Sequence, residues 1–133
     1  MTRLTFALLL LTGLCGCASV TMPENQHSRI YVTASCGPVK NVGARCVMTG
    51  MGSSSSFEAP GEVRVPNGWS MLSLQCQGEM LGSAQTTLVP KPNLGMLGNL
   101  LVGGAPGAVV DAATGRGLNY DRVVNLHRSQ CFR

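Results

Sequence analysis

The chain has 133 residues, of which 44% are hydrophobic, 5% aromatic and 12% charged, with 17 Gly and 7 Pro. This length suits one small domain and excludes a large multidomain enzyme. The Gly and Pro content is too high for a helical bundle, and the hydrophobic content is too high for a disordered chain. The formal charge of +4 comes from scattered Lys and Arg residues without a run of like charge, so we expect no nucleic-acid partner.

The beginning of the chain has the three regions of an export signal. Arg3 supplies a positive charge, residues 6–11 form an unbroken apolar run, and small residues and cysteines follow. The apolar run is too short to span a bilayer as a helix, which needs about 20 residues. Residues 14–17, Leu-Cys-Gly-Cys, resemble the lipobox of bacterial lipoproteins. The resemblance implies that residues 1–16 are a signal peptide and that Cys17 becomes the lipidated first residue of the mature chain.

The lipobox resemblance also implies a destination. Asp does not follow Cys17, which in Gram-negative lipoproteins implies delivery to the outer membrane, with the domain facing the periplasm. The alternatives are an ordinary secretory signal cleaved near Ala18 and an uncleaved N-terminal membrane helix. Residues 17–28 are mainly polar, and we expect them to form a lipidated tether before a single β-rich domain at 29–133.

Six short segments of that domain have the pattern of β-strands. Alternating apolar and polar residues or bordering turn residues predict strands at 28–35, 43–49, 61–65, 69–77, 82–89 and 120–128. The Gly- and Ser-rich tract at 50–56 is typical of a flexible loop. Short strands separated by frequent turn signals predict a mainly β fold, either a small β-sandwich or a partly open barrel.

A glycine-rich apolar segment at 94–113 precedes the last predicted strand. Residues 93–110 carry no charge, and their glycines leave backbone exposed for close packing. We expect a hairpin that covers the open side of the sheet. The alternative is a hairpin in contact with a bilayer, because uncharged Gly-rich runs also pack inside membranes. A phosphate-binding loop is not indicated, since the glycines match neither GxGxxG nor a P-loop.

Proline and glycine divide this segment into two expected helices. Pro106 cannot lie inside a continuous helix, but it fits the first turn of a second one. We therefore predict two short helices joined by a hinge at Gly103 and Gly104. Asp111 ends the apolar run, and we expect it to lock the hairpin to the sheet by accepting backbone N–H groups or by pairing with Arg116.

Four cysteines remain once the first two are assigned to the export signal. An even number in a small exported domain predicts two disulfide bonds, for which three pairings exist. Strand parity places Cys46 and Cys76 on the core face of their strands, so we predict that they pair with each other and that Cys36 pairs with Cys131. The alternative is a zinc site, but such sites draw on close cysteine pairs that the mature sequence lacks. We expect neither a metal nor another cofactor.

Two stretches carry a resemblance to a protein group. The run from Cys46 through Ala-Pro-Gly at 59–61 to Leu-x-Leu-x-Cys at 72–76 resembles small PEGA-like β-sandwich domains of proteobacterial outer-membrane lipoproteins. Residues 98–120 look like the glycine-rich stretch that follows in such lipoproteins. The resemblance implies an envelope-anchored module with no assigned chemistry.

Catalytic patterns are not recognisable in the sequence. The carboxylates are dispersed, no Ser-His-acid set is indicated, and pairing explains the four thiols. We expect His27 and His127 to be solvated side chains, and we do not expect an enzyme. The predicted function is a structural or binding module of the cell envelope, whose partners are the membrane through the N-terminal lipid and an envelope protein or the peptidoglycan.

Two other functions remain as alternatives. The first is an inhibitor of a periplasmic hydrolase of the lysozyme type, acting through an inserting loop at residues 53–56. The second is a membrane-active protein acting through the glycine-rich segment at 94–113.

Overall fold

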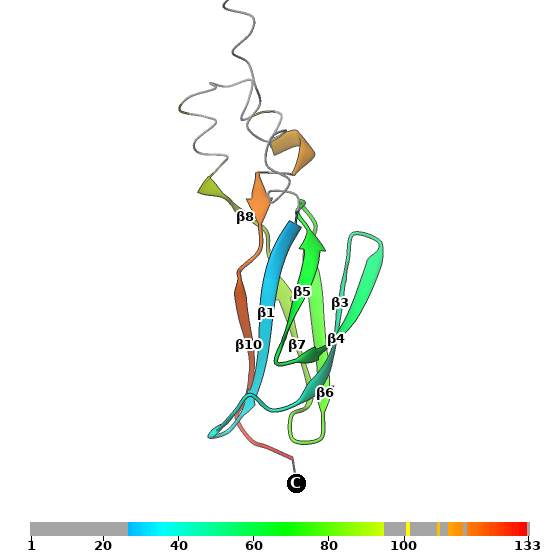
Figure 1. Ribbon diagram of the computed structural model, residues 1–133, viewed down its shortest axis with the longest axis vertical. Helices are drawn as coiled ribbons and strands as arrows, with labels where there is room; N and C mark the ends of the chain where they lie inside the picture. Colours follow the sequence, from blue (N-terminus) through cyan, green and yellow to red (C-terminus); the bar gives the residue numbers. More distant parts are fainter. Residues whose placement is uncertain (1–26, 95–100, 102–108, 110–111, 116, 133) are drawn as a thin grey trace, which may run out of the picture.

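The computed structural model describes residues 27–94, 101, 109, 112–115 and 117–132 of the chain. These residues form two four-stranded sheets and one two-stranded sheet, none of which closes into a barrel (Figure 1). The strands are β1 (His27–Cys36), β2 (Val39–Lys40), β3 (Ala44–Gly50), β4 (Ser53–Ala59), β5 (Gly61–Pro66), β6 (Leu72–Gly78), β7 (Gly82–Leu88), β8 (Lys91–Pro92), β9 (Leu118–Asn119) and β10 (Val123–Arg128). The prediction of a mainly β domain is confirmed.

The first sheet is built around β1. β10 pairs with β1 in parallel from Tyr31 to Cys36, while β5 pairs antiparallel with residues 27–32 on the other edge. β2 continues that second edge at Ser35 and Cys36. Because β10 begins its pairing only at Tyr31, the start of β1 extends beyond it.

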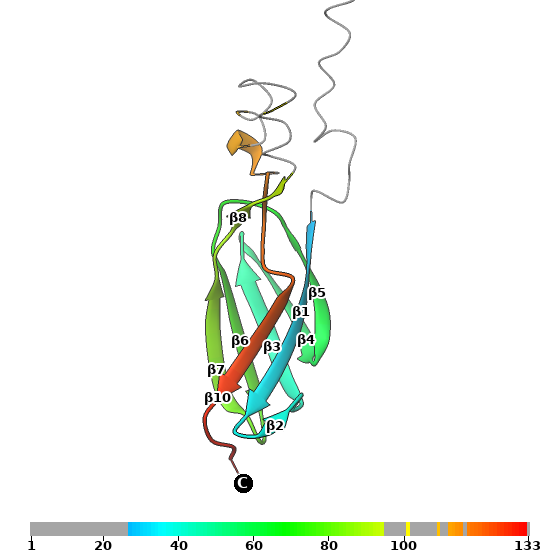
Figure 2. The same cartoon turned by 90° about the vertical axis from the view of Figure 1, so that its left-hand side faces the viewer.

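The second sheet is an antiparallel arrangement in the order β4-β3-β6-β7. The chain crosses from it to the first sheet at Ala59, where β4 ends, through a cis peptide bond to Pro60 and into β5 at Gly61. A side chain at Gly61 would collide with the carbonyl oxygen of Glu58, so this corner requires glycine. The two sheets face each other as a β-sandwich (Figure 2).

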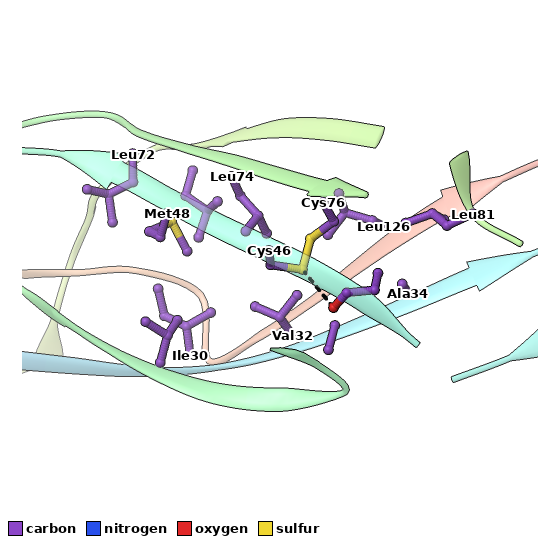
Figure 3. Close-up of a cluster of buried hydrophobic side chains, with 14 of the residues drawn as sticks. Ile30, Val32, Ala34, Cys46, Met48, Leu72, Leu74, Cys76, Leu81 and Leu126 are labelled. Carbon is purple, nitrogen blue, oxygen red and sulfur yellow. Dashed lines mark hydrogen bonds between the residues drawn. A yellow bond between two sulfur atoms is a disulfide. The ribbon is translucent and has the colours of Figure 1, made fainter. Parts of the chain in front are cut away.

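Strand alternation builds the core between the sheets (Figure 3). In β1, β3 and β6 every second side chain is buried, except at the end of β1, where Ser35 is buried as well. The alternating buried positions include Ile30, Val32, Ala34, Ala44, Cys46, Met48, Leu72, Leu74 and Cys76. Burying one large aliphatic side chain contributes about 1.5–3 kcal/mol. The alternating apolar side chains, buried between the two sheets, therefore supply most of the free energy that holds the sheets together.

The sandwich has two distinct ends. β1 begins at His27 at one end, which also carries β8 and a helical turn, and the chain terminates at the other (Figures 1 and 2). We call the first the N-terminal end and the second, where β10 finishes, the C-terminal end.

Two disulfides join the pairs that the sequence predicted. Cys46 and Cys76 are direct partners in the register of β3 and β6, with 4.0 Å between their Cα atoms. Cys36 and Cys131 link the end of β1 to the segment after β10, 95 residues later. The Cys46–Cys76 bond therefore links two neighbouring strands of the second sheet. The Cys36–Cys131 bond joins the two ends of the folded chain.

The six predicted strands are all present, with shifted boundaries. β1 already begins at His27, inside the predicted tether, and β6 begins only at Leu72, after an exposed Trp69. The two-residue strands β2, β8 and β9 were not predicted, because a pair of residues carries no periodic pattern.

The expected loop at residues 50–56 is wrong, because residues 53–59 form β4. β3 and β4 pair along their whole length and are joined by Met51 and Gly52, which have φ angles of 53° and 75°. Two consecutive positive φ values match the twist of a tight β-hairpin. The serine tract is therefore a paired edge strand, which removes the inserting loop on which the hydrolase-inhibitor alternative depended.

The predicted helical hairpin also needs correction. The described residues contain essentially no helix: Leu94, Leu101 and Val109 are helical as single described positions, and residues 112–114 form one helical turn. That turn ends where the Gly115 N–H donates to the Ala112 carbonyl over 3.2 Å. Gly115 has a φ angle of 70°, which ends a helix and favours glycine. Among the described residues, no helix is long and apolar enough to span a membrane. The rest of this prediction, including Gly103, Gly104, Pro106 and Asp111, lies outside the described residues.

The two disulfides lead to a quantitative prediction for stability. Replacing Cys46 and Cys76 by Ala removes a cross-link between residues 30 positions apart, and replacing Cys36 and Cys131 removes one over 95 positions. Loop-closure entropy predicts losses of about 3–4 and about 5 kcal/mol in unfolding free energy, respectively. Urea unfolding of each double variant measures the losses. Four free thiols in the mass spectrum of the native protein would contradict the premise.

Candidate functional site

A half-open cleft of about 450 Å³ lies at the N-terminal end of the sandwich. It forms where β1 extends beyond β10, so the chain between β9 and β10 passes beside the exposed start of β1. Along β1 the side chains alternate: His27, Arg29 and Tyr31 are exposed on the outer face, while Ser28 and Ile30 are buried. The outer side chains of β1 thus form a polar wall of the cleft, while Ile30 on the other face packs into the apolar core.

Ser28 fixes the floor of the cleft. Its side chain is only 7% exposed, and its hydroxyl donates to Asn67 Oδ1 over 2.6 Å while accepting the Tyr120 N–H over 3.1 Å. These bonds tie β1 to the β5–β6 loop and to the residue after β9. Because the Ser28 hydroxyl both donates and accepts a hydrogen bond, it fixes the relative positions of β1, the β5–β6 loop and the residue after β9.

Tyr120 ties the same segments from the other side. It is 3% exposed, and its hydroxyl donates to the Ser70 carbonyl over 2.6 Å. Burial raises the pKa of the Tyr120 hydroxyl above its ordinary value of 10.0, because the phenolate would lose hydration. Tyr120 therefore stays neutral and donates its hydrogen bond across the neutral pH range.

Positive charge predominates on the wall of the cleft. Arg29 and Arg122 line it against the single carboxylate of Glu62. Arg29 also lies directly opposite Arg64 in the pairing of β1 with β5. Like charges opposite each other weaken a sheet, so this pair adds positive charge here at a small cost in stability.

The cleft has the chemistry of a site for an oxyanion. Guanidinium groups bind carboxylates and phosphates through two parallel N–H bonds. The side-chain amides of Asn67, Asn93 and Asn119 also line the cleft and provide further polar groups. These groups could together hold an anionic oxygen.

A second polar cluster lies on the outer face of the first sheet. The Ser35 hydroxyl is 3.0 Å from Asn125 Oδ1 and 3.0 Å from His127 Nδ1. The Ser35 hydroxyl has only one hydrogen. When it donates that hydrogen to Asn125 Oδ1, it accepts a hydrogen bond from a protonated Nδ1 of His127. His127 thus has partners that the sequence did not indicate. Within the described ranges no carboxylate bonds to His127, and the cluster has the form of a cross-strand ladder.

Two further polar features are solvent-exposed. A shallow hollow of about 740 Å³ at the C-terminal end is lined by Arg45 and Glu58, which are cross-strand partners. Lys91 and Asp121 form an exposed ion pair of 2.8 Å, which contributes little to stability. No group of three potential metal ligands is found in the part of the chain that the structure describes.

The predicted site residues divide into two sets. The four disulfide cysteines lie in the core or beside it, while Cys17, Gly103, Gly104, Pro106 and Asp111 fall outside the described residues. The cleft was not predicted, because its residues come from four separate segments and match no motif. Comparison of the chain with protein-family models, with curated proteins and with solved structures finds no match.

The Ser28 network can be tested by a single substitution. Ser28→Ala removes two hydrogen bonds and leaves the buried Tyr120 N–H without its acceptor. We expect a loss of about 1–3 kcal/mol in unfolding free energy, measured by urea denaturation. Ser53→Ala is the matched control, since the Ser53 hydroxyl is exposed and bonds only to the Gly50 carbonyl over 3.3 Å. Equal effects of the two substitutions would contradict a special role for Ser28.

Proposed function

We propose that the protein is a non-enzymatic lipoprotein of the outer membrane that serves as a binding module in the cell envelope. Acylated Cys17 anchors it, the sandwich faces the periplasm, and the cleft at the N-terminal end binds an anionic group. The observation that carries the proposal is this cleft, with its ordered floor at Ser28 and its positive wall at Arg29 and Arg122.

The disulfides support an exported location. Stable disulfides form in oxidising compartments such as the periplasm. Cys36 and Cys131 join the two ends of the folded chain, and Cys46 and Cys76 join two strands of the core. The lipobox resemblance at residues 14–17 accounts for the anchor, since three acyl chains, at about 0.8 kcal/mol per buried methylene, hold a protein on a membrane essentially permanently.

Cys17 is the test of the anchor. Cys17→Ser removes the thiol that would be acylated, and we expect the protein to leave the outer-membrane fraction when expressed with its own signal. The measurement is fractionation of the envelope together with the intact mass of the purified protein, in which acyl chains add a defined mass. Cys15→Ser is the matched control and keeps the protein in the membrane. Continued membrane residence of Cys17→Ser, or a native mass without acyl chains, would contradict the anchor.

Arg122 is the test of the cleft. Titration of the full lipidated chain in detergent with inorganic phosphate, followed by the amide signals of Asn119 and Tyr120, reports on the cleft directly. We expect Arg122→Gln to weaken phosphate binding about tenfold, the equivalent of one lost charge-assisted contact of about 1.4 kcal/mol. Arg45→Gln, in the hollow at the opposite end, is the control and leaves binding unchanged. Identical affinities for all three proteins would rule out the cleft as the anion site.

A further inference from the structure

Large exposed apolar side chains gather at the N-terminal end of the sandwich. Trp69 is 62% exposed, Met71 64% and Leu94 85%, and Met51 is also exposed. Trp69 and Met71 lie in the loop between β5 and β6, Met51 lies in the β3–β4 turn, and Leu94 lies two residues after β8. We call these four residues the apolar tip. An exposed cluster of this kind marks a docking surface more often than chance.

The tip is held in place by close backbone packing. A Cβ atom at Gly68 would lie 2.8 Å from Met51 Cε, and one at Gly115 would lie 2.9 Å from Gly68 Cα. Trp69 Nε1 donates to the Ala112 carbonyl over 2.6 Å, which satisfies the polar atom of the ring. An indole that is already hydrogen-bonded can leave water for an apolar or interfacial environment without losing a bond.

The tether length brings this end to the membrane. Residues 18–26 separate Cys17 from the start of β1, and a fully extended chain over that interval reaches at most about 35 Å. β1 has ten residues, which span about 30 Å from His27 to Cys36. An acyl group on Cys17 therefore holds the N-terminal end within about 35 Å of the bilayer, whereas the C-terminal end can lie a strand length farther away.

Charge at this end suits a lipid surface. Arg29, Arg122 and His27 line the cleft beside the apolar tip, and Tyr120 connects the two, because its hydroxyl bonds to the loop that carries Trp69. Basic side chains near a membrane are attracted to anionic headgroups, and apolar side chains enter the interfacial region. Trp in particular is enriched at this depth of a bilayer.

From these observations we infer that the apolar tip docks on a bilayer that contains anionic phospholipids. Trp69, Met71, Met51 and Leu94 enter the interface, and the arginines of the cleft face the lipid phosphates. The inference rests on the proposed anchor at Cys17 and names the membrane phosphate as the anionic group of the proposed cleft. Docking of this kind fixes the orientation of the sandwich, with its C-terminal end directed into the periplasm.

Trp69 is the single tryptophan of the chain, so its fluorescence reports on the tip alone. The experiment uses the full lipidated protein in vesicles of phosphatidylethanolamine and phosphatidylglycerol with brominated acyl chains. We expect several-fold stronger quenching of Trp69 than of a reporter at the opposite end, made by Trp69→Phe with Phe132→Trp. Acrylamide in the aqueous phase should give the reverse order. Equal, weak quenching of both reporters by brominated lipid would overturn the inference.

A second pair of variants tests the contact itself. Met71→Asp places a charge in the tip and should reduce the quenching of Trp69 by brominated lipid several-fold, while Val39→Asp, an exposed aliphatic position in β2, should not. Trp69 shielded from both brominated lipid and acrylamide would mean that this chain or a second copy covers the tip, and would also overturn the inference.

The anchor and the docking surface fail in different ways. A lipidated protein whose Trp69 stays accessible to acrylamide on vesicles refutes the docking surface and leaves the anchor intact. A protein without acyl chains whose Trp69 is still quenched by brominated lipid refutes the anchor and supports the docking surface.

Discussion

The parallel pairing of β1 with β10 is the contact on which the other features depend. It joins Tyr31–Cys36 to Val123–Arg128 and so brings together the two ends of the folded chain. At the C-terminal end the Cys36–Cys131 disulfide makes this pairing covalent. At the N-terminal end only hydrogen bonds close it, through Ser28 and Tyr120. The cleft lies at the end where the pairing stops, because β1 continues there without β10.

Local patterns in the sequence predicted the strands well because the core depends on alternation. Cys46 and Cys76 illustrate this: each faces the core by parity within its own strand, and the two pair across the ladder. β4 shows the limit of such patterns. Its serines are mostly exposed and have no apolar period, and the strand exists because the tight turn at Met51 and Gly52 directs it back along β3.

The cleft could not be predicted because it depends on register and not on composition. Ser28 lies where the predicted tether meets the first predicted strand, and Asn67 lies in a turn. Tyr120 stands at the start of the last predicted strand. These three residues meet only when β1 and β10 are aligned so that Tyr31 faces Val123. A shift by one residue would turn Ser28 to the outer face and dissolve the network, since side chains alternate with a period of two.

The proposed anchor and the proposed docking surface reinforce each other physically. A short tether converts docking into an intramolecular event, with an effective concentration that reaches the millimolar range for short linkers. Weak contacts from Trp69, Met71 and their neighbours then suffice to orient the domain, because the anchor already holds it at the membrane. The anchor supplies the affinity and the tip supplies the orientation. Under this proposal the domain presents its opposite end, where Arg45 and Glu58 line a shallow hollow, toward the periplasm.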